Sequence, residues 1–168
     1  LSPDEVYVSK NPYFFQLNPG KKLRLTTTAD YVASQFRNEN IIVLNRGNGG
    51  QDNKIIIDKL KEKFSAEETL AHNLHFYNIW LEGSNGLENL LKPEQPNIIV
   101  MAETNEVNVS TAMNRLNSLA KKFPVTVIGI QEYTRLQSID TEILHNVSFR
   151  YLAPFFIDYT TPQVNSFI

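Results

Sequence analysis

The sequence predicts an α/β fold, a doubly wound three-layer sandwich built on a five-stranded, mostly parallel sheet. Three observations support this prediction. Short, nearly continuous apolar runs recur along the chain, amphipathic helical patterns separate them, and glycine or proline borders several of the runs. Apolar strands that alternate with helices indicate a parallel sheet covered on both faces. Right-handed crossovers then place helices on both sides of that sheet.

Five segments are expected to form the strands. The three clearest are residues 41–44, 98–101 and 125–130, which are short, apolar and rich in β-branched side chains. Residues 74–80 form a weaker fourth candidate. Residues 147–152 alternate between polar and apolar side chains, as expected for a strand at the edge of a sheet.

Helices are expected between these strands, because apolar residues recur at spacings that place them on one helix face. The marker residues are Leu25, Ala29, Val32 and Phe36; Ile57, Leu60 and Phe64; Leu87, Leu90 and Leu91; and Val109, Met113, Leu116, Ala120 and Phe123. The third of these helices is expected to begin after Ser84, and a last short helix is expected over residues 140–145. Asp52 and Asn105 are predicted N-caps of the second and fourth.

Composition narrows the class of protein. A chain of 168 residues is expected to form one domain. Its net charge of −2 argues against a nucleic-acid binder that depends on overall charge. The absence of cysteine excludes disulfides and cysteine nucleophiles. No apolar run approaches the roughly 20 residues that a membrane-spanning helix needs, so no membrane span is expected.

In a fold of this class, ligands gather at the carboxyl ends of the strands. The loop Arg46-Gly47-Asn48-Gly49-Gly50 follows the first strand and is rich in glycine. It lacks the Gly-Lys-Ser/Thr of a phosphate loop, and Asp52 stands where a dinucleotide fingerprint has its third glycine. Two interpretations remain: a tight strand-to-helix turn, or contact with a polar ligand through Arg46, Asn48 or backbone amides.

Acidic and histidine side chains are the candidates for catalysis or metal binding in this sequence. Glu103 and Glu106 flank the end of the third strand, where they could serve acid–base catalysis, ligand contact together with Asn105, or helix capping. His72 and His75 could bind a metal if the segment were helical. The segment is predicted to be a strand, which would place them on opposite faces. No catalytic residue, metal site or cofactor is therefore expected.

Ordered short segments carry a resemblance to a known family. Asn11-Pro12-Tyr13-Phe14-Phe15-Gln16-Leu17-Asn18-Pro19 is followed by a helix and a strand, and the segments 122–129, 131–133 and 151–159 come later in order. Together they resemble the second lobe of type I periplasmic solute-binding proteins. They are similar to a branch found in cell-envelope proteins of Bacteroidetes-like bacteria, in which peptidoglycan-binding LysM modules often precede the lobes. The resemblance covers nearly the whole chain.

The resemblance implies a flavodoxin-like lobe that forms half of a hinged, two-lobed protein in the periplasm or cell envelope. A small polar ligand, such as an amino acid, would lie between the lobes, and closure would be a hinge motion. Residues 1–168 would form one lobe, with 1–20 and 153–168 as crossover segments to the other. Transport-type members usually have a Tyr-Gly pair after the first strand of this lobe, where this chain has Asn48-Gly49-Gly50-Gln51.

Three functions are therefore kept as hypotheses. The first is a non-catalytic, ligand-binding lobe of a solute-binding-like protein, partnered by the second lobe of the same protein. The second is a peptidoglycan-associated scaffold module that binds no small ligand. The third is a small flavodoxin-like enzyme, which is disfavoured because the sequence lacks a recognisable catalytic motif. For the first, the expected ligand-binding residues are Arg46, Asn48, Thr104, Asn105, Gln131 and Glu132. Arg46 would meet a carboxylate, and the amides and hydroxyl would orient the ligand.

Overall fold

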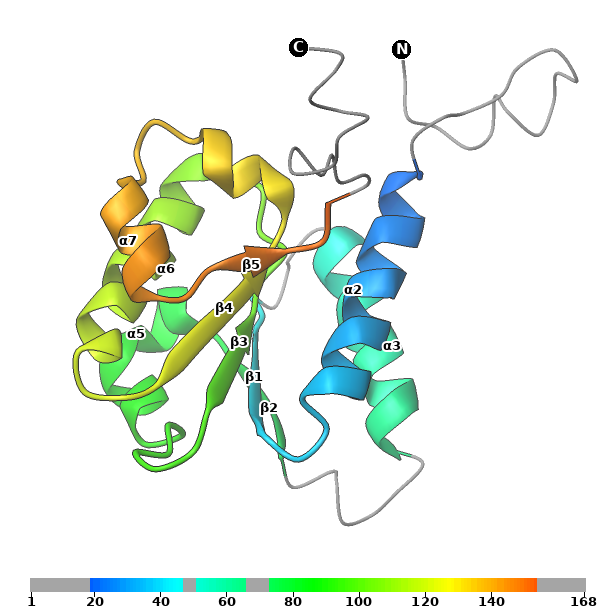
Figure 1. Cartoon of the computed structure of the whole chain (residues 1–168), viewed down its shortest axis with the longest axis horizontal. Coiled ribbons are helices and arrows are strands. Elements are labelled where there is room, and N and C mark those ends of the chain that lie inside the picture. Colours follow the sequence, from blue (N-terminus) through cyan, green and yellow to red (C-terminus); the bar gives the residue numbers. More distant parts are fainter. Residues whose placement is uncertain (1–18, 47–50, 66–72, 154–168) are drawn as a thin grey trace, which may run out of the picture.

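The strands form one parallel sheet, as the sequence predicts (Figure 1). The computed structural model describes residues 19–46, 51–65 and 73–153. The order of the strands across the sheet is β2-β1-β3-β4-β5. Their bounds are β1 Asn40–Leu44, β2 Leu74–Tyr77, β3 Asn97–Val100, β4 Val125–Gly129 and β5 Arg150–Tyr151. The sheet is therefore doubly wound, with β1 and β3 at its centre and the short strand β5 at one edge.

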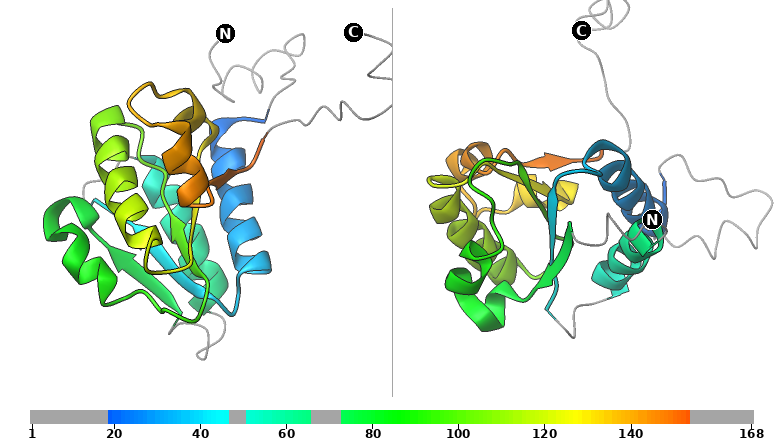
Figure 2. Two further views of the ribbon diagram at one scale, coloured as in Figure 1. Left: turned by 60° about the vertical axis from the view of Figure 1, so that its left-hand side comes forward. Right: turned by 90° about the horizontal axis from the view of Figure 1, so that it is seen from below.

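Helices cover both faces of the sheet, as Figure 2 shows. On one face lie α2 (Lys21–Gln35) and α3 (Gln51–Ser65). On the other lie α5 (Ile79–Glu88), α6 (Glu106–Ala120) and α7 (Thr141–Asn146), with a 3₁₀ helix, η1 (Gln131–Arg135), between β4 and α7. Within the described ranges, none of the helices has the length and apolar character needed to cross a membrane. The three-layer α/β prediction is confirmed.

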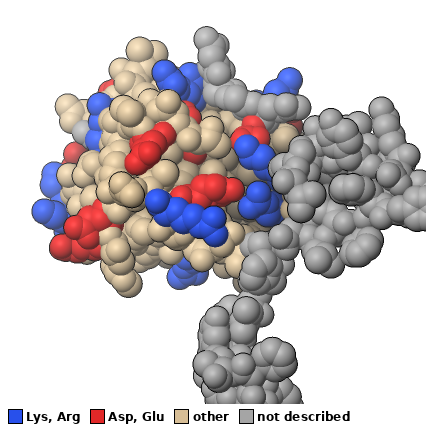
Figure 3. Space-filling view, turned by 90° about the horizontal axis from the view of Figure 1, so that it is seen from above, with Lys and Arg blue, Asp and Glu red and all other residues tan. Residues whose placement is uncertain are grey.

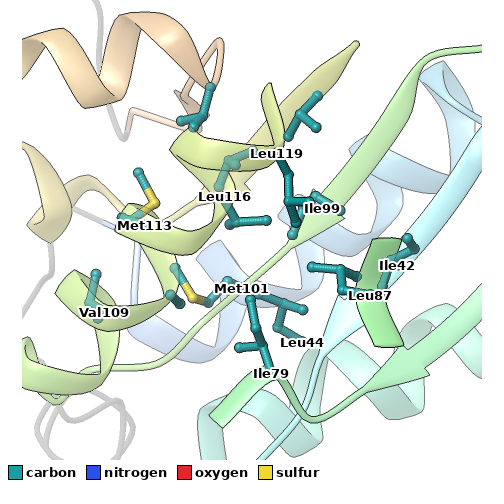
Figure 4. Close-up of a cluster of buried hydrophobic side chains, with 14 of the residues drawn as sticks. Ile42, Leu44, Ile79, Leu87, Ile99, Met101, Val109, Met113, Leu116 and Leu119 are labelled. Carbon is teal, nitrogen blue, oxygen red and sulfur yellow. The ribbon is translucent and has the colours of Figure 1, made fainter. Parts of the chain in front are cut away.

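Two separate hydrophobic cores hold the layers together. In β1, Ile41 and Val43 pack in the core beneath α2 and α3. The alternate residues, Ile42 and Leu44, pack in the core beneath α5 and α6. Figure 4 shows Ile42 beside Leu87 of α5, and Leu44 beside Ile79. Every residue of β1 is buried, because both faces of the strand are covered. Each such aliphatic side chain contributes about 2 kcal/mol to the free energy of unfolding.

The predicted boundary between the second strand and the helix after it is wrong. The strand expected over residues 74–80 ends at the close of β2, and Ile79 already begins α5. The Asn78 side chain accepts a hydrogen bond from the Leu81 amide and so caps the helix. The helix expected after Ser84 therefore starts earlier than predicted. The backbone kinks at Gly83, where φ is 75°, and this kink interrupts the regular spacing of apolar residues that would mark the helix in the sequence.

The other predicted helix caps and strand ends are only partly confirmed. Asn105 caps α6 as predicted, and Asp140 caps α7. Asp52 is not an N-cap, because α3 already begins at Gln51 and Asp52 lies in its first turn. The strand expected over residues 147–152 is shorter than predicted, and Val147 is instead the C-cap of α7. Most of the predicted crossover segments, at both ends of the chain, lies outside the described residues.

A buried amide network at the amino ends of the strands was not foreseen. Asn97 begins β3 and is fully buried. Its Oδ1 accepts hydrogen bonds from the Lys92 amide and from Asn40 Nδ2, each at 2.8 Å. Its Nδ2 faces the carbonyls of Lys92, Gln95 and Pro124 at 2.8, 3.0 and 3.2 Å. One side chain therefore ties the starts of β1 and β3 to the turns before β3 and β4.

We expect Asn97→Ala to lower the free energy of unfolding by about 3 kcal/mol, because it leaves several buried polar groups without partners. Urea denaturation followed by circular dichroism measures the loss. Asn38→Ala is the matched control, because Asn38 is exposed on the turn before β1. Equal stability of the two variants would contradict a structural role for this network.

Candidate functional site

The candidate site is the edge of the sheet at which the parallel strands end. The neighbouring strands β1 and β3 are followed by helices on opposite faces, α3 and α6, so the loops that leave them diverge. Such a switch point is where open α/β sheets hold ligands. The first turn of α2 and the end of β5 lie at the same edge (Figure 1). We call this edge the carboxyl edge.

Most of the predicted ligand-binding residues reach the carboxyl edge. Arg46 follows β1 and is exposed. Thr104 follows β3, next to Asn105, and both are exposed. Gln131 and Glu132 open η1 directly after β4. Asn48, the remaining predicted residue, lies outside the described residues.

Polar side chains of the loop after β3 accept hydrogen bonds from nearby backbone amides and so hold the conformation of the loop. Glu103 Oε1 accepts hydrogen bonds from the Thr104 amide at 2.9 Å and from the Asn105 amide at 2.8 Å. Asn105 Oδ1 accepts one from the Asn108 amide at 3.2 Å. These are the contacts of a helix cap, which satisfies amides that the first turn of α6 leaves free. The capping interpretation of Asn105 is confirmed, and Glu103 supports the same loop.

Two cations of α2 belong to the site and were missed by sequence reasoning. Lys21 Nζ lies 2.5 Å from Asp52 Oδ2 of α3. Arg24 Nη1 lies 3.6 Å from Glu132 Oε1 of η1. They were missed because candidate residues were expected only in the loops that follow strands, and α2 precedes the first strand. One signal was available: cations in the first turn of a helix oppose its dipole, which favours acidic residues there.

The carboxyl edge is hollowed between α2 and η1. A cavity of about 110 Å³ is lined by Lys21, Thr104, Ile130, Glu132, Tyr133 and Leu136. A smaller hollow of about 20 Å³ adjoins it, sharing Lys21, Ile130 and Glu132 and adding Arg24 and Leu152. We call the larger one the η1 cavity. Figure 3 looks onto this end of the molecule and shows acidic and basic side chains close together.

A larger hollow, of about 150 Å³, lies elsewhere, between α2 and α3. Its lining includes Asp30 from the second half of α2, Arg37 from the turn after α2, and Lys63 from the end of α3. Lys63 Nζ pairs with Asp30 Oδ1 at 3.1 Å. Because the carboxyl ends of the strands lie at the opposite ends of these helices, this hollow takes no part in the candidate site.

Buried polar side chains hold the end of β3 from both layers. On the α3 side, Asn53 is buried and its Oδ1 accepts a hydrogen bond from the Ala102 amide at 3.2 Å. On the other side, the Tyr133 hydroxyl donates to the Glu103 carbonyl at 2.7 Å, with the Met101 carbonyl at 3.3 Å. Neither residue was foreseen. Together they fix the position of the loop that carries Thr104 and Asn105.

Burial raises the pKa of Tyr133 well above the ordinary tyrosine value, and the nearby carboxylates of Glu103 and Glu132 add to the shift. Its ring is only 1% exposed. The phenol therefore stays neutral and keeps its proton as a hydrogen-bond donor. In this role Tyr133 positions the loop after β3 rather than acting on a ligand itself.

The histidine pair finds no metal-binding partners in the described part of the chain. His75 lies in β2 and is half-buried, and burial lowers its pKa, with a smaller contribution from the positive charge of Lys92. His72 lies outside the described residues. Among the residues that the structure describes, no three His, Cys, Asp or Glu side chains cluster as a metal site requires.

The chain was compared with protein-family models, with curated proteins and with solved structures, and no match was found. What the carboxyl edge does is therefore inferred from its own geometry.

We expect Tyr133→Phe to flatten the alkaline pH dependence of stability. Below pH about 10 the phenol is protonated in both states, so its contribution is fully present. Above that pH the unfolded phenol ionises while the buried one does not, and stability falls by up to about 1.4 kcal/mol per pH unit. Urea denaturation between pH 8.5 and 11 measures this slope, which should be smaller in the variant.

The control for this measurement is Tyr151→Phe, because Tyr151 lies at the same edge with a side chain 37% exposed. It should keep the slope of the unmodified chain. A constant difference in stability between Tyr133→Phe and the unmodified chain across this pH range would contradict the assignment.

Proposed function

We propose that the chain is a non-catalytic, ligand-binding lobe of a two-lobed, solute-binding-like protein of the periplasm or cell envelope. A small polar molecule, similar in size and polarity to an amino acid, would lie between the lobes. The observation that carries this proposal is the carboxyl edge itself. There the β1/β3 switch point, exposed polar side chains and the η1 cavity come together.

The path of the chain supports a second lobe over this edge. Lys21, at the start of α2, and Leu152, just beyond β5, line the same small hollow. The described chain therefore begins and ends its α/β unit at neighbouring points on the carboxyl edge. A second lobe connected through these points would lie above the η1 cavity and could close over it by a hinge motion.

The polar groups of the edge suit binding rather than chemistry. Glu103 accepts hydrogen bonds from its own loop, and Asp52 pairs with Lys21. These acids therefore support structure. Arg46 and Thr104 remain exposed at the ends of β1 and β3. A charged donor and a hydroxyl placed on separate loops can fix the orientation of a polar ligand.

Titration of the full chain with a panel of polar metabolites, amino acids included, tests the proposal. One lobe supplies only part of a cleft, so we expect weak binding and would follow it by ¹H–¹⁵N NMR spectra. Arg46→Ala should weaken binding of a carboxylate-bearing hit about tenfold, because it removes a charge-assisted hydrogen bond. Lys121→Ala is the matched control, an exposed cation at the far end of α6.

The proposal is contradicted if no metabolite shifts the amide signals of residues 45–46, 103–105 and 131–133. It is equally contradicted if Arg46→Ala and Lys121→Ala alter binding to the same extent, since only the first lies at the carboxyl edge.

A second candidate function is supported by apolar side chains on the same edge. Leu23, Leu81 and Val107 are 54%, 83% and 73% exposed. Each lies in the first turn of a helix that begins at the carboxyl edge, α2, α5 and α6 respectively. Exposed apolar groups at the starts of these helices suit a lasting protein contact. They fit a scaffold module that binds no small ligand, the alternative that would associate with peptidoglycan.

Sedimentation with purified peptidoglycan separates the two candidates. The scaffold hypothesis expects the full-length protein to pellet with peptidoglycan and the metabolite panel to give no hit. A protein that stays in the supernatant while a metabolite binds at the carboxyl edge contradicts the scaffold hypothesis.

A further inference from the structure

We infer that the η1 cavity binds the apolar chain of a short-chain monocarboxylate, whose carboxylate enters the adjoining smaller hollow and pairs there with Arg24 in place of Glu132. The inference rests on the proposed function and names the chemical class of the ligand. It starts from an arginine whose hydrogen-bonding capacity is incompletely used.

Arg24 is only partly satisfied in the structure. Its Nε is buried and has no hydrogen-bond acceptor among the described residues. Its Nη1 lies 3.6 Å from Glu132 Oε1, longer than a direct hydrogen bond between nitrogen and oxygen. A buried donor without an acceptor destabilises the folded chain, because it has lost its hydrogen bonds to water. The side chain is 27% exposed and lines the smaller hollow at the carboxyl edge.

Glu132 is a partner that a ligand can replace. Its side chain is 52% exposed, and it lines both the η1 cavity and the smaller hollow that contains Arg24. An exposed ion pair at this distance contributes little to stability, so the Glu132 carboxylate can move into solvent at small cost. A ligand carboxylate in its place can form two parallel hydrogen bonds to the arginine fork, the stronger geometry.

The rest of the cavity suits an apolar ligand body. Ile130, Leu136 and the ring of Tyr133 line it, and Thr104 supplies a hydroxyl. Its volume of about 110 Å³ corresponds to roughly three or four water molecules. That space accommodates a branched aliphatic chain of a few carbons. Apolar walls in this cavity, with Arg24 lining the smaller hollow beside it, match a short-chain monocarboxylate.

Three probes with one carbon skeleton test the charge requirement. They are isovalerate, the neutral isovaleramide and the cationic isoamylamine, each titrated into the full chain and followed by ¹H–¹⁵N NMR spectra. Only isovalerate should give saturable shifts, at the amides of Arg24, Thr104 and residues 130–133. Equal or stronger shifts from isovaleramide or isoamylamine would overturn the inference.

Variants of the two paired residues give opposite expected effects. Arg24→Gln should weaken isovalerate binding about tenfold or more, because it removes the charged donor. Glu132→Gln should strengthen binding about threefold, because it removes the competing carboxylate charge while keeping the length of the side chain. Lys22→Gln, an exposed cation on the same helix that does not line the cavity, should leave binding unchanged.

The Glu132 variant separates ligand binding from a structural role. If the Arg24–Glu132 pair only holds η1 against α2, Glu132→Gln should weaken binding or leave it unchanged, and either result overturns the inference. If Arg24→Gln fails to fold, Arg24→Lys replaces it; it keeps the charge, loses the fork, and should bind more weakly than the unmodified chain.

The outcomes also distinguish this inference from the proposed function. If isovalerate gives no shifts but a metabolite of the panel binds at the carboxyl edge, the carboxylate inference fails and the proposed function stands. If neither the three probes nor the panel shift these amides, both fail.

Discussion

Burial of both faces of the sheet is the constraint on which this structure depends. Every residue of β1 and β3 is buried, so each face must be covered by helices. Crossover helices make the strands parallel, and parallel strands end at one edge. Because α3 and α6 lie on opposite faces, the loops after β1 and β3 separate at that edge. The position of the candidate site therefore follows from the packing of apolar side chains.

Buried polar side chains then set the finer geometry that apolar packing leaves free. Asn97 ties the strand starts together, and Asn53 and Tyr133 hold the end of β3 from opposite layers. Tyr133 can approach so closely only because position 129 is glycine. A Cβ atom on Gly129 would lie 2.7 Å from the rings of both Tyr133 and Phe149. The loop that carries Thr104 is thus supported by side chains that touch no ligand, as a precise binding site requires.

Sequence patterns predict local features well and features of tertiary origin poorly. The central strands were found because a β-branched apolar run needs no distant partner to be recognised. The boundary between β2 and α5 was misplaced because Ile79 and Trp80 are apolar in either state, and only the Asn78 cap marks the change. At the site, topology placed the loops after β1, β3 and β4 at one edge. Lys21 and Arg24 were missed because packing against α3 and η1 brings them there.

The positive charges at the start of α2 are neutralised unequally, and this leaves one cation able to bind an anion. Lys21 and Arg24 stand in the turns where the helix dipole is positive, an arrangement that raises the energy of cations. Two acids from other elements offset this cost, but unequally. Asp52 meets Lys21 at 2.5 Å, whereas Glu132 stays 3.6 Å from Arg24. The first pair is complete and joins α2 to α3. The second is incomplete. Both of its residues line the smaller hollow, and Glu132 also lines the η1 cavity beside it. An incoming anion can therefore supply the electrostatic stabilisation that Arg24 lacks.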